Sequence, residues 1–205
     1  ENGLSGQNSP VIYDKVRGMY KTYPWWIAER NNMTLVNEAK CGTTITYLPQ
    51  YTNAFSETRY KNLPKDADYI LIKFGINDET SHKNAPLGTI EDTTNTTFYG
   101  AWNVVLEYLI TNHPWAKIGI IVTNGCSVNY VNAIIESAKK WGIPYLDEAN
   151  GEQVPLLNRT NKSYVCAKAR NLRDAQMKVG LNNAHPNIKA HEYESTIVEN
   201  FLKSL

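Results

Sequence analysis

The sequence has no long hydrophobic run and no strong excess of charge. A membrane-spanning helix needs about 20 consecutive apolar residues, and no apolar run approaches that length. The formal net charge is only +1, with 21 Lys and Arg against 20 Asp and Glu. Such a balance gives no support for nucleic acid or an anionic membrane as a partner. We therefore expect a globular protein with no membrane span and no nucleic-acid partner.

Cysteine is also scarce. Cys41, Cys126 and Cys166 are an odd number of thiols with wide spacing, which predicts neither a disulfide framework nor a zinc site. A glycine-rich phosphate loop is missing too, which disfavours a nucleotide-binding domain. The sequence begins at Glu1 rather than Met, so a leader could already be removed. We accordingly favour a secreted or cell-surface location over a cytoplasmic one.

Short apolar runs alternate with longer amphipathic ones along the chain. The apolar runs predict strands at residues 34–37, 69–74, 117–123 and 143–147. Helical spacing predicts helices at residues 23–31, 98–109, 131–141 and 191–202, and a short one near 167–176. Residues 1–21 have no clear period and predict a loop. This order predicts a single α/β domain over residues 1–205, with a parallel sheet flanked by helices.

Three polar segments follow predicted strands, at residues 37–44, 75–79 and 123–127. Because the carboxyl ends of parallel strands share one edge of a sheet, we expect these segments to converge there. Asn77 in the second segment could donate an N–H to a developing oxyanion, and the backbone N–H of Gly42 could do the same. Gly, Asn and Asp are also ordinary turn residues, so plain turns remain open at both places.

His185 is the candidate general base. Pro186 restricts the residue before it to extended backbone, so we expect a histidine on a short rigid loop. Taken alone, a surface-loop histidine remains the alternative. His82 and His113 are expected in loops, and His191 in the first turn of the last helix.

Three strings in this order resemble motif blocks of the SGNH hydrolases, also called GDSL esterases and lipases. They are NEAKCGTT at residues 37–44, GIND at 75–78 and NNAHPN at 182–187. The resemblance covers the chain from about Tyr23 to its end. It implies a three-layer flavodoxin-like fold with strand order 2-1-3-4-5, and it implies no metal and no organic cofactor.

The resemblance also implies roles for individual residues. The Gly42 N–H and the Asn77 side chain would form two donors of an oxyanion hole, and His185 would take the proton of a serine nucleophile. Asp78 would orient the loop of Asn77. Asn182 stands where the family has a carboxylate, and a neutral amide cannot stabilise the imidazolium by charge. In the best-studied triad that exchange costs about 10⁴ in kcat. The sequence leaves open whether Asn182 is natural or engineered.

The family's first block, a buried strand followed by Gly-Asp-Ser, is not found. Ser5 in the string GLSG is the nearest match for the catalytic serine, but Leu4 occupies the Asp position and no strand precedes it. We favour a strand and serine upstream of Glu1. Without that central strand, its two neighbours would lack a partner. We therefore expect the chain to fold poorly alone, or the gap to be filled by residues 1–21 or a partner strand.

The sequence thus predicts a serine ester hydrolase for small acyl esters, with acetylated carbohydrate as the first candidate. The alternative is a carbohydrate-binding module that kept the fold and lost the chemistry, as part of a bacterial surface protein or a phage-tail protein. Thirteen Tyr and five Trp could stack on sugars, although Trp25, Trp26, Trp102 and Trp141 fit a core better. The oligomeric state is not indicated by the sequence.

Overall fold

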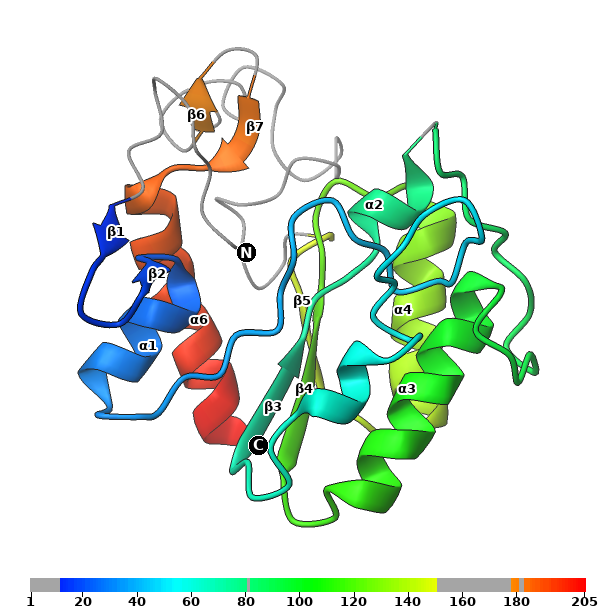
Figure 1. Cartoon of the computed structure of the whole chain (residues 1–205), viewed down its shortest axis with the longest axis horizontal. Coiled ribbons are helices and arrows are strands. Elements are labelled where there is room, and N and C mark those ends of the chain that lie inside the picture. Colours follow the sequence, from blue (N-terminus) through cyan, green and yellow to red (C-terminus); the bar gives the residue numbers. More distant parts are fainter. Residues whose placement is uncertain (1–11, 81, 151–177, 181–182) are drawn as a thin grey trace.

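A parallel sheet forms the centre of the structure, a computed structural model (Figure 1). It describes residues 12–80, 82–150, 178–180 and 183–205. The strands of the sheet are β3 (Tyr69–Ile72), β4 (Lys117–Val122) and β5 (Tyr145–Asp147), with β4 in the middle. All of β4 after Lys117 is buried, as expected of a strand covered on both faces. These three strands confirm the sequence prediction.

Helices cover both faces of the sheet and complete three layers (Figure 1). One layer holds α1 (Tyr23–Arg30) and α6 (Ile188–Ser204), and the other holds α3 (Phe98–Asn112) and α4 (Val128–Lys140). Pro24 lies in the first turn of α1, where its missing N–H breaks no helical hydrogen bond. The four predicted helices and the flavodoxin-like layering are therefore confirmed.

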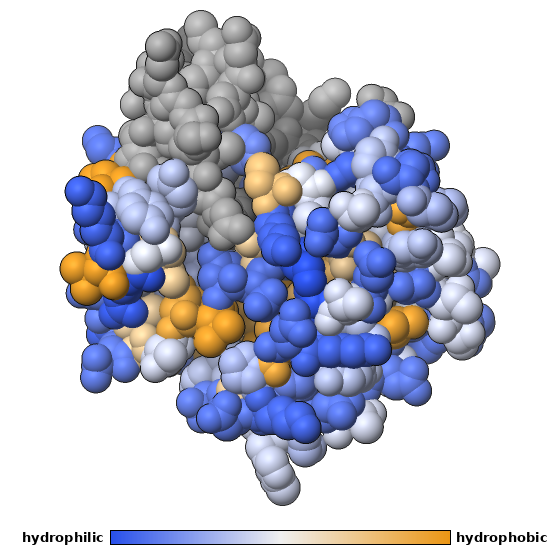
Figure 2. Space-filling model, viewed as in Figure 1, coloured by the Kyte–Doolittle hydropathy of each residue, from blue (hydrophilic) through white to orange (hydrophobic). Residues whose placement is uncertain are grey.

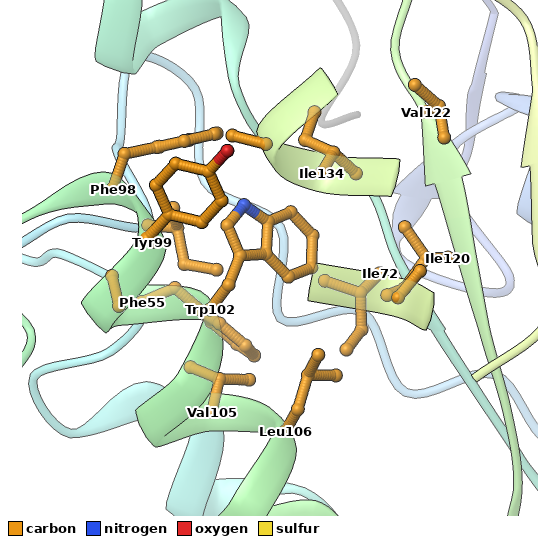
Figure 3. Close-up of a cluster of buried hydrophobic side chains, with 14 of the residues drawn as sticks. Phe55, Ile72, Phe98, Tyr99, Trp102, Val105, Leu106, Ile120, Val122 and Ile134 are labelled. Carbon is orange, nitrogen blue, oxygen red and sulfur yellow. The ribbon is translucent and has the colours of Figure 1, made fainter. Parts of the chain in front are cut away.

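The larger core lies between the sheet and the α3–α4 layer. Trp102 of α3 is fully buried and extends toward Ile72 and Ile120 of the sheet (Figure 3). The other face of the sheet packs Leu71 and Leu146 with α1 and α6. Side chains alternate between the two faces of a strand. A residue that directly follows a strand therefore faces the same helical layer as the residue two positions before it.

Two predictions for the N-terminal part are wrong. Residues 34–37 form no strand, and Val36 is 50% exposed. A strand needs a hydrogen-bonded partner, and within the described residues β3 pairs with β4 alone. The predicted loop at residues 1–21 contains instead a small hairpin of β1 (Tyr13–Asp14) and β2 (Met19–Tyr20), which stands apart from the parallel sheet.

Three further boundaries differ from the predictions. Residues 76–79, predicted as a loop, form the single helical turn α2 (Ile76–Glu79). The last helix begins at Ile188 because Asn187 caps it, its side-chain oxygen accepting the Ala190 N–H at 3.0 Å. His185 lies on a strand rather than a loop, since β7 (Asn183–Pro186) pairs with β6 (Lys178–Gly180). The helix predicted near 167–176 lies outside the described residues.

The face shown in Figure 2 is mostly hydrophilic, with small separate hydrophobic areas. Large exposed hydrophobic side chains are spread over different elements, among them Val16, Trp115 and Val128. Of the predicted core tryptophans, Trp25 and Trp102 are buried, whereas Trp26 and Trp141 are only half-buried. No helix in the described part has the length and apolar character to cross a membrane.

Candidate active site

The three polar segments meet at the carboxyl edge of the sheet, as the sequence predicts. The side-chain amide of Asn77 donates to the carbonyl oxygen of Thr43 at 3.0 Å. The N–H of Ser127, the N-cap residue of α4, donates to Glu79 Oε2 at 2.7 Å. The short helix α2 is therefore bonded to the Gly42 segment on one side and to the segment after β4 on the other.

Asp78 joins α2 to the Gly42 segment through its fully buried carboxylate. Oδ1 accepts the N–H of Thr46 at 2.9 Å, and Oδ2 accepts the N–H of Ile45 at 3.2 Å. Burial raises the pKa of Asp78 to about 6, although these hydrogen bonds pull it down. The carboxylate thus holds two backbone groups from a segment more than 30 residues away, in addition to the bond made by Asn77.

Gly75 lets the chain turn sharply from β3 into α2. Its φ is 137°, in the region that favours glycine, and a Cβ there would lie 3.1 Å from Cys126 Sγ. Burial also raises the pKa of that thiol to about 12. Since the thiolate is the nucleophilic form, Cys126 is a packing residue rather than a nucleophile.

Two cations, neither of which was predicted from the sequence, donate hydrogen bonds to the Gly42 segment. Gly42 is exposed, with φ of 73° and no atom within 4 Å of where a Cβ would stand. Lys83 donates to its carbonyl oxygen. The buried Arg59, in the turn η1 (Arg59–Asn62), donates to Thr43 Oγ1 at 3.1 Å and to the carbonyl of Glu38. Each is a lone basic residue in a polar stretch, so the sequence carries no pattern that marks it.

The remaining predicted residues lie on other parts of the chain. His185 is exposed on β7, which leads directly into α6. Figure 1 shows β7 and α2 toward the same end of the molecule, β7 beyond the α1–α6 layer and α2 beside α4. Ser5 and Asn182 lie outside the described residues. The structure thus brings together Gly42, Asn77 and Asp78, and it carries His185 on a separate element.

Several solved structures are similar in fold to this chain over most of their length. A protein from Lactobacillus plantarum is 27% identical, with a TM-score of 0.68 over 89% of this chain and 88% of its own. A protein from Bacteroides uniformis, provisionally named a GDSL-like lipase, is 19% identical, with a TM-score of 0.68 over 100% of this chain and 85% of its own. A protein from Bacteroides ovatus with the same provisional name is 20% identical, with a TM-score of 0.64 over 90% of this chain and 79% of its own.

The chain has a GDSL-like fold. No family model matches the sequence, and no curated protein matches it either. At these identities the likeness establishes the fold alone. Within the described part of this GDSL-like chain, no group of three or more His, Cys, Asp or Glu could hold a metal ion.

The GDSL-like fold of this chain encloses an ionic cluster of Lys73, Glu148 and Glu194. Lys73 Nζ lies 2.9 Å from Glu148 Oε2 and 2.6 Å from Glu194 Oε1. The two carboxylates are at most 1% exposed, and the Lys73 side chain is 14% exposed. The sequence signals for it are a lysine at the end of one apolar run and a glutamate after another, and neither was predicted to form a site.

The pKa of Glu148 provides a stability test. Burial first, and then the charge of Glu194, raise it above its ordinary value of 4.5, while Lys73 opposes them. Its folded-state pKa therefore exceeds its unfolded one. The stability linked to Glu148 is fully present below about pH 4.5 and is lost as the pH rises toward the higher folded value.

Glu148→Gln should remove this pH dependence, because a neutral amide cannot ionise. Urea unfolding at pH 5, 6, 7 and 8 should show this effect in the free energy of unfolding. The value for the variant should rise relative to that of the native protein by up to about 1.4 kcal/mol for each pH unit. Glu199, whose pKa Lys203 lowers to about 2 through a hydrogen bond, titrates below this range and affects both proteins alike. Parallel stability curves would mean that Glu148 is already ionised at pH 5.

Proposed function

We propose that this chain is a serine-type ester hydrolase acting on small acyl esters, with acetylated carbohydrate as the first substrate class to test. One observation carries the proposal. At the carboxyl edge of a GDSL-like sheet, the Asn77 turn is hydrogen-bonded directly to the segment that presents the exposed backbone of Gly42.

This arrangement suits the stabilisation of negative charge on an oxygen. The Asn77 amide carries two N–H groups, and the bond to Thr43 uses one and fixes the orientation of the plane. The second N–H and the backbone N–H of Gly42 are the proposed donors to the tetrahedral oxyanion. Donors fixed before the reaction lower the barrier because they need no reorganisation as charge develops.

His185 is the proposed base. It would take the proton of the serine hydroxyl as that oxygen attacks the acyl carbonyl, and would return it to the departing alcohol. Water would then attack the acyl-serine, with His185 taking a proton from the water and returning it to the serine oxygen as the acid leaves. Among residues 1–205, Ser5 is the proposed nucleophile. Asn182 is the proposed acceptor of the N–H on the second ring nitrogen of His185. Because this amide carries no charge, we expect slower hydrolysis than a carboxylate at this position would give. No step requires a metal or an organic cofactor.

Asn77→Ala tests the oxyanion donor. Loss of one donor should lower kcat for p-nitrophenyl acetate by about 10²–10³ and leave KM nearly unchanged, since the bond forms mainly in the transition state. Asn112→Ala, which removes an exposed amide at the end of α3, is the matched control and should keep full activity.

Two results would contradict the hydrolase. One is equal kcat in Asn77→Ala and in the native chain. The other is a folded native chain that hydrolyses no acetyl ester but binds glycans, which would establish the carbohydrate-binding alternative. The Asn112→Ala control separates either result from a general loss of folded protein.

A further inference from the structure

The ionic cluster of Lys73, Glu148 and Glu194 joins three parts of the fold. Lys73 follows β3 directly, Glu148 follows β5 directly, and Glu194 lies in the second turn of α6. By strand alternation, Lys73 and Glu148 extend the side of the sheet that packs on α1 and α6. The cluster therefore fastens the N-terminal half of α6 to the carboxyl edge of the sheet.

Neighbouring rings enclose the cluster. Tyr23 of α1 lies with its ring 5.3 Å from Lys73 Nζ. The ring of His191 stacks on Tyr23 at 6.3 Å, and His191 Nδ1 lies 3.8 Å from Glu194 Oε2. Both aromatic side chains are at most 5% exposed. Because the two carboxylates are buried as well, a substrate cannot reach them, so a direct catalytic role does not fit.

Stability alone is a poor explanation for such a cluster. Removing charged groups from water costs several kcal/mol for each ion, and well-packed apolar residues in their place are often neutral or stabilising. Here two carboxyl groups share one ammonium group, and Glu148 Oε1 is buried with no hydrogen-bond partner among the described residues. Because removing these groups from water costs free energy, the cluster is expected to have a role other than stabilising the fold.

Its location indicates that role. Lys73 precedes Asn77 by four residues in the chain, across Phe74, Gly75 and Ile76. On the other side, α6 starts at Ile188, just after β7 with His185. The cluster is thus the direct bond between the element that carries the oxyanion donor and the helix that follows the base.

We infer that Lys73, together with Glu148 and Glu194, is a positioning centre that sets the His185 segment against the Asn77 turn. The inference rests on the proposed function for its catalytic meaning. A rigid ion pair fixes the direction and distance between two elements more tightly than apolar contacts, which tolerate sliding. Misplacement of a reacting group by about 1 Å costs up to about 10² in rate.

The test replaces the charges by apolar groups of similar size, in the triple variant Lys73→Met/Glu148→Leu/Glu194→Leu. We expect it to fold with unchanged or higher resistance to urea. Its kcat for p-nitrophenyl acetate should fall about tenfold or more with little change in KM. Backbone amides of residues 185–191 should exchange with deuterium faster than in the native protein.

A second ion pair provides the matched control. Arg30 of α1 lies 2.7 Å from Glu199 of α6, so it links the same helical layer more than a turn farther along α6 from His185. Arg30→Met/Glu199→Gln should leave kcat and the exchange of residues 185–191 unchanged. Should the triple variant fail to fold, the single change Glu194→Gln, which keeps the shape and removes one charge, takes its place.

The outcomes separate this inference from the proposed function. An active native enzyme whose folded triple variant keeps native kcat and native exchange overturns the positioning role alone. A native chain without esterase activity overturns the proposed function, and exchange then decides: faster exchange confined to residues 185–191 supports the positioning role, and unchanged exchange overturns it.

Discussion

His185→Ala should lower kcat for p-nitrophenyl acetate by about 10³–10⁴, the largest kinetic effect expected in this chain. Without the imidazole, the serine hydroxyl keeps its proton during attack and the departing alcohol receives none. The fold should not change, because His185 is exposed on β7 and the helix that follows is capped by Asn187. Initial rates at saturating ester, with urea unfolding alongside, measure both quantities.

His82→Ala is the matched control, since His82 is an equally exposed histidine. Its kcat should equal that of the native protein. Native activity in His185→Ala would assign the base to another residue and would leave the GDSL-like fold without the proposed chemistry.

Asp78→Ala should cause the largest loss of stability near the site, about 2–5 kcal/mol in the free energy of unfolding. The change leaves the buried N–H groups of Ile45 and Thr46 without an acceptor, and each unsatisfied group costs about 1–3 kcal/mol. Asp78→Asn should lose less stability, because its one remaining side-chain oxygen still accepts one of these two N–H groups. Its NH₂ group would face the other N–H, so one donor stays without an acceptor. Urea unfolding at pH 8, where the native carboxyl is ionised, provides the measurement.

Activity should follow the same order in these variants. The loop that presents Gly42 loses one or both of its backbone anchors, so kcat should fall more in Asp78→Ala than in Asp78→Asn. The matched control is Asp92→Asn, at a half-buried carboxylate that accepts the Thr89 N–H at 3.1 Å and the hydroxyl groups of Thr89 and Thr97. It should cost less than about 1 kcal/mol and leave kcat unchanged. Equal losses of stability and of kcat in the Asp78 and Asp92 variants would show that the burial of Asp78 does not increase its contribution.

The parts of the fold with a repeating pattern were predictable from the sequence. Residues 69–74 and 117–123 are mostly apolar runs, and the spacing of Phe98, Trp102 and Val105 marks one face of α3. These elements can be recognised from neighbouring residues alone, because burial selects apolar residue types at regular positions. The same logic predicted that the polar segments at residues 75–79 and 123–127 would converge, since parallel strands end at a common edge. The segment at 37–44 joins them although no strand precedes it.

What depended on distant partners was not predictable. Residues 34–37 have strand-forming composition, but no local signal tells whether a neighbouring strand exists. Arg59 and Lys73 are single charged residues whose partners lie 21 and 121 positions away. A sequence pattern shows neither partner. The placement of His185 against Asn77 is also a long-range relation without a local sequence signal, so it stays a prediction.

The hydrogen bonds of Asp78 and Asn77 close chain loops of 32 to 34 residues, whereas the bond from Lys73 to Glu194 closes one of 121 residues. Loop-closure entropy grows with the logarithm of length, so the longer closure costs about 1 kcal/mol more. During refolding, the Gly42–Asn77 half can therefore assemble while α6 is still undocked. Recovery of esterase activity should then lag behind recovery of the tryptophan fluorescence of the α3 core.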